Sequence, residues 1–282
     1  MTPRRTIVVT GSSGRVGAAI AAEFAVDHEI RGLDRVAGPF TTHPGSVEDP
    51  VLVREAMAGA NLVVHTASLH APHVGRETEA RFRAVNVAGT ELLLDAAAGA
   101  GVSRFIYTST TSVYGHAMEP GEAAVWVTED LEPAPRDIYD ETKLAAEALC
   151  RAAVGEGRVE CISLRISRCF PEPERVVALH RLHRGVDLRD VAQAHRLAST
   201  VPLAGFGAYN VSAQSPFEIE DCAELLADAP AVLRRRVPRI EALFAARNWR
   251  LPDSIDRVYA IDKARRELGY SPRFNFLTEF SH

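Results

Sequence analysis

The chain has 282 residues, of which 46% are hydrophobic and 24% are charged, so it can bury a sizeable core and is neither disordered nor fibrous. Its formal net charge of -5 argues against a nucleic-acid-binding protein, which needs a basic surface to displace counterions from phosphates. Its four cysteines show no paired spacing, which indicates neither a disulfide framework nor a metal site and favours a reduced, cytoplasmic protein.

The N-terminal segment MTPRR precedes an apolar run that is too short for the core of a signal peptide. No later apolar run approaches membrane-spanning length, so we expect no membrane partner. The run Ile7 to Val9 is expected to be a strand that leads into TGSSGRVG at Thr10 to Gly17. An alanine-rich pattern over Ala18 to Phe24 predicts a helix directly after this glycine-rich loop.

Each glycine of the loop has a physical use in a dinucleotide site. Gly11 can take the backbone angles of a tight turn, Gly14 lets the main chain approach a ligand, and Gly17 lets helix pack on strand. The free amides at the start of the helix would then face a pyrophosphate. The loop therefore predicts a phosphate-binding turn, whose alternative is an ordinary connection between strand and helix.

The next apolar segment, Glu29 to Leu33, ends at Asp34, where a dinucleotide site places a carboxylate on the adenosine ribose. Asp34 can accept hydrogen bonds from both ribose hydroxyls and would repel a 2′-phosphate, so NAD is expected in preference to NADP. Arg35 follows the carboxylate and could partly neutralise it, so we expect a preference rather than exclusion.

Strand-like and helix-like segments alternate along the following chain. After a loop rich in Pro and Gly at 38–45, we expect helices over about 48–58, 77–98 and from 137, and strands at 61–65, 105–108 and 160–164. This alternation is typical of a doubly wound parallel sheet with helices on both faces. The hydroxyl-rich run TSTTSVYG, Thr108 to Gly115, should lie at the carboxyl edge of that sheet, where ligands bind.

Tyr139 and Lys143 lie four residues apart on the helix that begins near Asp137, and therefore on the same helix face. A phenol is a poor base at neutral pH, but an ammonium one turn away, together with an oxidised nicotinamide, would lower its pKa. The phenol could then exchange a proton with a substrate oxygen while hydride moves to or from the cofactor.

These motifs together carry a family resemblance. The runs TGSSGRVG, VVHTAS, NVAGTELLLDAA, FIYTSTTSVYG and YDETKLAAE, with Asp34, resemble the extended short-chain dehydrogenase/reductases, also called NAD-dependent epimerase/dehydratases. The resemblance covers about the first two thirds of the chain. It implies a Rossmann domain that binds a nicotinamide dinucleotide, Tyr139 as catalytic acid/base, Lys143 holding the ribose and tuning that tyrosine, and Thr110 bonding the reacting oxygen.

The resemblance also implies a wider set of site residues. Those expected at the cofactor are Gly11, Ser13, Gly14, Arg15, Val16, Gly17, Asp34, Arg35, Ser46, Val47, Thr66, Ala67, Ser68, Asn86, Thr108, Tyr139, Lys143 and Ile166. Those expected at the substrate are Ser68, His70, Thr110, Thr111, Ser112, Tyr139, Arg168 and Arg175. A homodimer is expected through the helices at about 77–98 and 137–154, by the same resemblance.

Several positions depart from the family pattern. Thr111 and Ser112 stand where dehydratases carry Asp-Glu, which makes dehydration by that route unfavourable. Ser46 stands where an aspartate often holds the adenine, so Val47 and its backbone would carry that contact. Arg168 stands where nucleotide-sugar enzymes usually place an asparagine on the diphosphate, and the chain between Arg168 and Asp187 is too short for their usual substrate lobe.

The connection RISRCFPEPERV, residues 165–176, is similar to the compact branch that contains uronate dehydrogenases, which oxidise free sugar acids. We expect residues 1–165 to bind the dinucleotide and residues 166–282 to form a small substrate-binding region interleaved with the end of the sheet. The expected activity is NAD-dependent hydride transfer with a secondary alcohol or ketone of a sugar-like molecule. A nucleotide-sugar epimerase with retained NAD and a non-catalytic dinucleotide-sensing protein are the alternatives.

Overall fold

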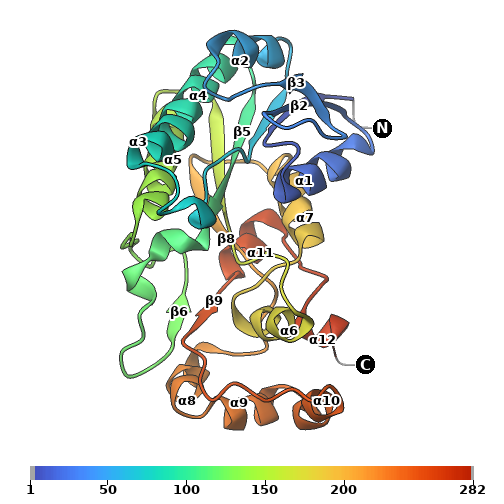
Figure 1. Ribbon diagram of the computed structural model, residues 1–282, viewed down its shortest axis with the longest axis vertical. Coiled ribbons are helices and arrows are strands. Elements are labelled where there is room, and N and C mark those ends of the chain that lie inside the picture. Colours follow the sequence, from blue (N-terminus) through green and yellow to red (C-terminus); the bar gives the residue numbers. More distant parts are fainter. Residues whose placement is uncertain (1–3, 281–282) are drawn as a thin grey trace.

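A seven-stranded parallel sheet is the main element of the computed structural model, which describes residues 4–280 (Figure 1). Residues 1–3 and 281–282, at the outer ends of the two expected regions, lie outside the described part. The sheet order is β3-β2-β1-β4-β5-β7-β8. Its strands are β1 (Thr6–Thr10), β2 (Glu29–Asp34), β3 (Thr41–Pro44), β4 (Leu62–His65), β5 (Arg104–Thr110), β7 (Glu160–Ile166) and β8 (Gly207–Val211). The strand order reverses between β1 and β4, which confirms the doubly wound Rossmann-type prediction.

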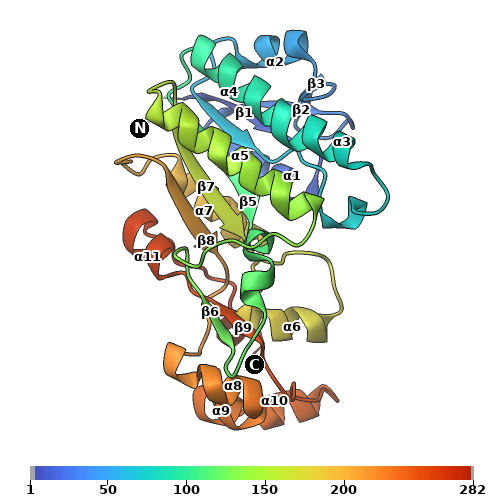
Figure 2. The same ribbon diagram turned by 90° about the vertical axis from the view of Figure 1, so that its left-hand side faces the viewer.

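Two hydrophobic cores cover the two faces of this sheet, because successive strand side chains point to opposite sides. Val8, Val63 and Phe105 face the layer of α2 (Pro50–Met57), α4 (Gly89–Gly99) and α5 (Ile138–Gly155). Their strand neighbours, such as Val9 and Val64, face α1 (Arg15–Ala25), α7 (Leu188–Ala198) and α11 (Asp262–Leu268). Figure 2 shows α4 and α5 lying side by side over the first face. Burial on both sides explains why the strands read as continuous apolar runs.

The long helix expected over 77–98 runs instead from Glu79 to Gly99 with a change of pitch inside it. A π-helical segment η2 (Arg83–Ala88) separates α3 (Glu79–Phe82) from α4. Such wide turns are rare and occur frequently at functional sites. The segment contains Asn86, whose contacts are described below.

The segment expected as a Pro/Gly-rich loop at 38–45 contains the edge strand β3, which pairs with the end of β2. The loop prediction was therefore wrong for Thr41–Pro44. The loop was predicted because proline is common in loops. An edge strand nevertheless tolerates Pro44, because one side of an edge strand needs no hydrogen-bonding partner. Strand β8, which the sequence patterns did not indicate, closes the opposite edge of the sheet.

The far end of the molecule carries a smaller helical lobe (Figure 1). It contains α6 (Glu174–His183), α8 (Cys222–Ala227), α9 (Ala229–Arg236) and α10 (Ile240–Ala246), with a separate core that includes Leu225 and Phe244. A two-stranded parallel sheet of β6 (Val125–Val127) and β9 (Arg257–Tyr259) joins this lobe to the main sheet. Short 3-10 helices are η1 (Ala71–His73), η3 (Thr111–Tyr114), η4 (His116–Met118) and η5 (Ile219–Asp221).

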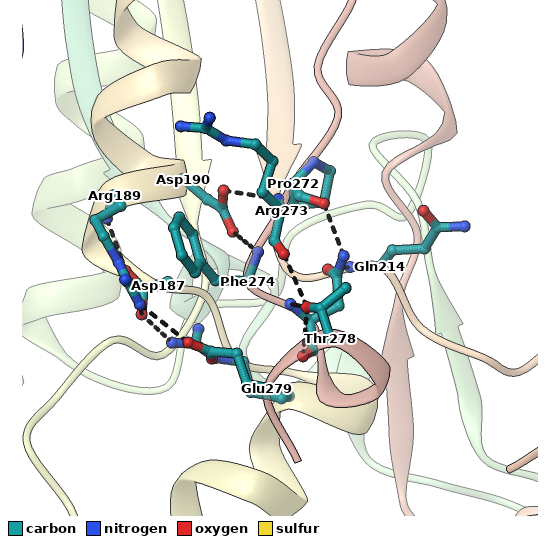
Figure 3. Close-up of polar contacts among 12 residues, drawn as sticks. Asp187, Arg189, Asp190, Gln214, Pro272, Arg273, Phe274, Thr278 and Glu279 are labelled. Atoms are coloured by element: carbon teal, nitrogen blue, oxygen red, sulfur yellow. Dashed lines mark hydrogen bonds and ion pairs between the residues drawn. The ribbon is translucent and has the colours of Figure 1, made fainter. Parts of the chain in front are cut away.

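The C-terminal segment with α12 (Phe276–Glu279) is fastened to the start of α7 (Figure 3). The buried carboxylate of Asp190 accepts the amides of Arg273 at 2.9 Å and Phe274 at 3.0 Å. The Arg189 guanidinium lies 3.3 Å from the centre of the Phe274 ring and donates to Glu279 at 3.0 Å. These contacts tie the end of the chain to a helix that packs on the main sheet.

Candidate active site

A cavity of about 780 Å³ lies at the carboxyl edge of the main sheet. The cavity is lined by residues that end or directly follow β1, β2, β3, β4, β5 and β7. Open parallel sheets bind ligands at this edge. Most of the residues proposed from the sequence line it: Gly11, Gly14, Arg15, Val16, Gly17, Asp34, Arg35, Ser46, Val47, Thr66, Ala67, Ser68, His70, Thr108, Thr110, Thr111, Ser112, Tyr139, Lys143, Ile166 and Arg168. Ser13, Asn86 and Arg175 do not.

The glycine-rich loop forms a close-packed cradle at one end of this cavity. Gly11 has φ +70°, and a Cβ there would lie 2.7 Å from Thr66 Oγ1. A Cβ on Gly17 would lie 2.1 Å from the Gly11 carbonyl oxygen, so only glycine lets α1 start this close to the turn. The N-cap residue Gly14 has no side chain to bond the first amides of α1, which leaves them available to an anion. The cradle therefore fits a dinucleotide pyrophosphate.

Asp34 stands at the end of β2 beside the cradle. Its Oδ2 accepts the amide of Ser13 at 2.9 Å, and its Oδ1 accepts the amide of Val36 at 2.9 Å. The Ser13 hydroxyl donates to the Val36 carbonyl at 2.6 Å. Ser13 thus orients the carboxylate from behind the wall, which explains why it does not line the cavity itself.

The adenosine end of the cavity holds a carboxylate that the sequence reasoning missed. Glu48 lines the wall next to Ser46 and Val47, and the Ser46 hydroxyl donates to Glu48 Oε2 at 2.8 Å. Hydrogen bonding from Arg81 holds the pKa of Glu48 below its usual value. Glu48 thereby brings a negative charge to the region where the family aspartate is replaced by Ser46. The sequence signal that could have identified Glu48 is an acidic residue two positions after Ser46.

A buried hydrogen-bonded chain forms the floor between β1 and β4. Thr10 Oγ1 accepts the amides of Thr66 and Ala67, each at 3.2 Å, so its own hydrogen points to His65 Nδ1 at 2.7 Å. The other ring nitrogen then donates to Thr90 Oγ1 at 3.0 Å. Burial lowers the pKa of His65 to about 3, so the ring stays neutral. This series of hydrogen bonds holds the loop after β4 in a single arrangement.

Asn86 lies behind the wall and fixes the same loop from the other side. Its Oδ1 accepts the Leu69 amide at 2.8 Å, and its Nδ2 donates to the Leu69 carbonyl at 2.9 Å. The same Nδ2 donates to Thr142 Oγ1 at 3.0 Å. Asn86 therefore orients the segment that carries Ser68 and His70 and does not itself face the cavity.

Thr110, Tyr139 and Lys143 meet at the middle of the cavity. Thr110 ends β5, while the other two lie on the first turns of α5, whose N-cap Asp137 accepts the Tyr139 amide at 2.9 Å. The hydroxyl of Thr110 lies near the Tyr139 phenol and acts to lower its pKa. Lys143 Nζ donates to the Thr108 carbonyl at 2.7 Å and lies 4.2 Å from the centre of the Tyr107 ring.

Burial dominates the electrostatics of this group. Burial raises the pKa of Tyr139 above its usual value, and the Thr110 hydroxyl offsets only part of that rise. Burial also lowers the pKa of Lys143 to about 7. At neutral pH Tyr139 is therefore a phenol, which suits it to donate a proton. The lowered pKa expected for Tyr139 refers to the site with oxidised nicotinamide bound, so it stays a prediction.

On the substrate side, Ser112 belongs to a network with two residues that were not predicted. Its hydroxyl donates to Asp140 Oδ1 and accepts from Arg136 Nη2 at 3.0 Å. Arg136 Nε also donates to Asp140 Oδ2 at 3.2 Å. Asp140 is fully buried, so it holds Arg136 at the cavity wall without facing the cavity.

Three further arginines, Arg168, Arg184 and Arg257, line the end of the cavity toward the helical lobe. Arg168 Nε donates to Glu172 Oε1 at 3.0 Å, while Arg184 and Arg257 both contact Asp256. Neither carboxylate lines the cavity.

Arg175, the other candidate named from the sequence, turns away and donates to the Arg250 carbonyl at 3.0 Å. Its place on the outer side of α6 could not be read from the chain. Neither Arg184 nor Arg257 was named as a site residue from the sequence, and Arg257 had no local signal.

Two loops meet over the mouth of the cavity. The rings of His70 and Phe170 are stacked with centres 6.4 Å apart, and Arg15 Nη1 donates to the Cys169 carbonyl at 3.1 Å. His70 lines the cavity, and its expected contact with substrate stays a prediction. No helix within residues 4–280 is both long and apolar enough to cross a membrane, and no group of three metal-ligating side chains gathers in that part.

Residues 7–176 match the model of the NAD dependent epimerase/dehydratase family, which covers more than half of the chain. The chain belongs to this family. A curated relative, the 3-beta-hydroxysteroid dehydrogenase of Mycolicibacterium neoaurum, is 35% identical over 174 residues, which cover 57% of this chain and 46% of the relative. This chain thus spans less than half the length of that relative.

Solved structures agree with the family assignment. A short-chain dehydrogenase/reductase superfamily protein from Agrobacterium tumefaciens with bound NAD has a TM-score of 0.72 and 26% identity, covering 98% of this chain and 95% of that protein. A mutated uronate dehydrogenase has a TM-score of 0.69 over 96% of this chain and 82% of its own, but its 18% identity supports the fold alone. The family is NAD-dependent, and the cradle, Asp34 and the amides of α1 fit that cofactor.

Proposed function

We propose that this protein is an NAD-dependent oxidoreductase that transfers hydride between nicotinamide and a secondary alcohol or ketone of a compact, sugar-like substrate. The observation that carries the proposal is that Thr110, Tyr139 and Lys143 open into the same cavity as the glycine-rich cradle. Residues 4–165 would bind the dinucleotide, and residues 166–280 would complete the substrate site. NAD, when bound, supplies or accepts the hydride.

The protein residues would handle the proton. In the reductive direction the Tyr139 phenol donates its proton to the carbonyl oxygen as hydride reaches the carbonyl carbon, and Thr110 hydrogen-bonds that oxygen. The ammonium of Lys143, one helical turn away, stabilises the phenolate that is left and holds the ribose. The oxidative direction runs the same transfers in reverse, with the phenolate as base.

The arginines favour a substrate in which an anionic group lies at some distance from the reacting carbon. Arg184 and Arg257 share the single carboxylate of Asp256, so one positive charge at that end has no partner among these groups. Arg136 and Arg168 add hydrogen-bond donors on neighbouring parts of the wall. A steroid, the substrate type named for the Mycolicibacterium relative, would desolvate that remaining positive charge without pairing it.

The decisive assay follows NADH formation and consumption with free sugars, sugar acids, sugar phosphates, keto-glycosides and nucleotide sugars. We expect net redox with an anionic compact substrate. The alternative of an epimerase predicts tightly retained NAD, detectable by mass spectrometry of the purified protein. Interconversion of a nucleotide-sugar pair without net NADH change would overturn the redox proposal, and no turnover with any substrate would favour the sensing alternative.

Tyr139→Phe tests the proton relay. It should lower turnover by at least about a hundredfold, the usual lower range for a positioned acid or base, while the NAD dissociation constant stays nearly unchanged. Tyr209→Phe is the matched control, because that phenol bonds Glu267 rather than the cavity. Full turnover by Tyr139→Phe would show that another residue carries the proton.

Arg257→Gln tests the anionic group. It should raise KM for the anionic substrate about tenfold or more with a smaller change in kcat, since a charged hydrogen bond contributes about 1.5–3 kcal/mol. Arg234→Gln is the control, because Arg234 is exposed on α9 and pairs with Glu241 at 2.7 Å. Equal KM values for charged and neutral substrates in both proteins would contradict the assignment.

A further inference from the structure

A buried ion pair lies directly behind the proposed proton relay. Glu147 is four residues beyond Lys143 on α5, and both side chains are almost fully buried. Arg165 on β7 donates to Glu147 from Nε at 3.1 Å and from Nη2 at 2.7 Å. Ser163 Oγ donates to the same carboxylate at 2.9 Å. This cluster does not line the cavity and has no part in the chemistry described above.

We propose that Glu147 is a positioning residue for Lys143: its buried carboxylate supplies the negative charge that favours the ammonium form of this buried lysine. The two residues are one helical turn apart on the same face, which places Glu147 next to Lys143 along α5. The usefulness of that ammonium rests on the proposed function, in which it stabilises the Tyr139 phenolate and holds the cofactor ribose.

The surroundings of Lys143 offer little other support for a positive charge. Its neighbours are the Thr108 carbonyl, which accepts its hydrogen bond, and the Tyr107 ring beneath it. Two titratable groups on α5, Glu147 and Cys150, change the pKa of Lys143. The charge of Lys143 in turn lowers the pKa of His65 on β4 and of His70 in the loop after β4. Tyr107 on β5 contacts the lysine through its ring. Burial makes His65 neutral and keeps the Tyr107 phenol protonated, so Glu147 is the carboxylate that acts on the lysine.

The carboxylate is itself held ionised by two residues of β7. Burial opposes its ionisation, but the bonds from Arg165 and Ser163 hold the pKa of Glu147 below its usual value. Arg165 in turn lies 4.9 Å from the centre of the Tyr114 ring, whose hydroxyl donates to Asn210 at 2.7 Å. The three charges therefore alternate in sign through the layer between α5 and β7, with Glu147 in the middle.

The composition of the chain makes this charge directly measurable, since Lys143 and Lys263 are its only lysines. Protein grown with ε-¹³C-lysine gives two signals, and Lys263, which bonds the Ala208 carbonyl at 3.1 Å on another part of the sheet, is the internal reference. Titration of the Lys143 signal would be compared in the natural protein, Glu147→Gln, and the double variant Glu147→Gln with Arg165→Gln.

We expect the half-titration of Lys143 to fall to lower pH in the order natural protein, double variant, single variant. The double variant loses the attraction of Glu147 and should shift by about one pH unit or more, and the single variant should shift further because Arg165 is left unpaired. Glu141→Gln, an exposed change on the same helix, should leave the signal unchanged. The affinity for NAD should weaken at correspondingly lower pH in both Glu147 variants.

The double variant separates the proposed role from a structural one. If it regains thermal stability and also titrates like the natural protein, Glu147 serves only as the partner of Arg165 and the inference is wrong. Because the titration needs no substrate, a lysine shift with no turnover on any substrate would overturn the proposed function while leaving the charge relationship intact.

Discussion

Acid should destabilise this protein steeply, because three buried histidines are held neutral. Burial lowers the pKa of His65 and His183 to about 3 and that of His195 to about 4. In the unfolded chain the same rings titrate near 6.5. Their contribution to stability is therefore fully present above about pH 6.5 and is lost as the pH falls toward the folded-state values.

The size of the effect follows from counting protons. At about pH 5 the unfolded chain binds about three protons on these rings that the folded chain does not bind, and each contributes about 1.4 kcal/mol per pH unit. The free energy of unfolding should then fall by about 4 kcal/mol per pH unit from these groups. Since whole domains have about 5–15 kcal/mol in total, acid unfolding should be complete within a few pH units.

Urea denaturation at several pH values between 7 and 5, at constant ionic strength, follows this fall, and the slope is compared at its pH 5 end, where the unfolded rings are nearly fully protonated. His183→Gln should reduce it by about 1.4 kcal/mol per pH unit, because one of the three rings no longer takes up a proton on unfolding. His116→Gln is the control, since the His116 side chain is 59% exposed and pairs only with exposed Glu119. Equal slopes in the natural protein and His183→Gln would refute the reasoning.

Two further predictions concern the cofactor and the assembly. Asp34→Ala should reduce the preference for NAD over NADP by about tenfold or more, because it removes the carboxylate that we propose to bind the ribose hydroxyls, and calorimetry with both dinucleotides measures this. Tighter binding of NADP by the unchanged protein would contradict the role given to Asp34. We also expect a homodimer through the faces of α4 and α5, so that solution scattering at micromolar concentration gives about twice the chain mass of 30.7 kDa. A monomeric mass would count against that interface.

Local patterns in the sequence were sufficient for the parts of the fold that are built locally. The turn at Gly11, the buried strands β1, β4, β5 and β7, and the pair Tyr139 and Lys143 all lie within continuous segments, so their spacing alone indicated them. Strand β3 was missed because Pro44 looks like a loop residue, although the edge position makes it acceptable.

The substrate end of the site depends on contacts between distant segments and could not be read in this way. Arg257 reaches the cavity only because β9 pairs with β6 across more than a hundred residues, and strands of three residues carry almost no pattern. In a chain with so many arginines, nothing local distinguished Arg257 from Arg175. Asn86 and Ser13 were predicted at the cofactor but do not line the cavity: the Asn86 side chain holds Leu69, and the Ser13 amide holds the Asp34 carboxylate.

The two-stranded sheet of β6 and β9 has a consequence for attempts to divide the chain. One strand follows the segment that carries Thr110, and the other comes from the last part of the sequence, so neither strand has its hydrogen-bonding partner without the other. A fragment that stops after β8 would retain the dinucleotide cradle but lose the wall formed by Arg257 and Tyr259 and leave β6 as an unpaired edge. The substrate-binding end is therefore not a detachable module: exchanging it between relatives requires transplanting β6 and β9 together.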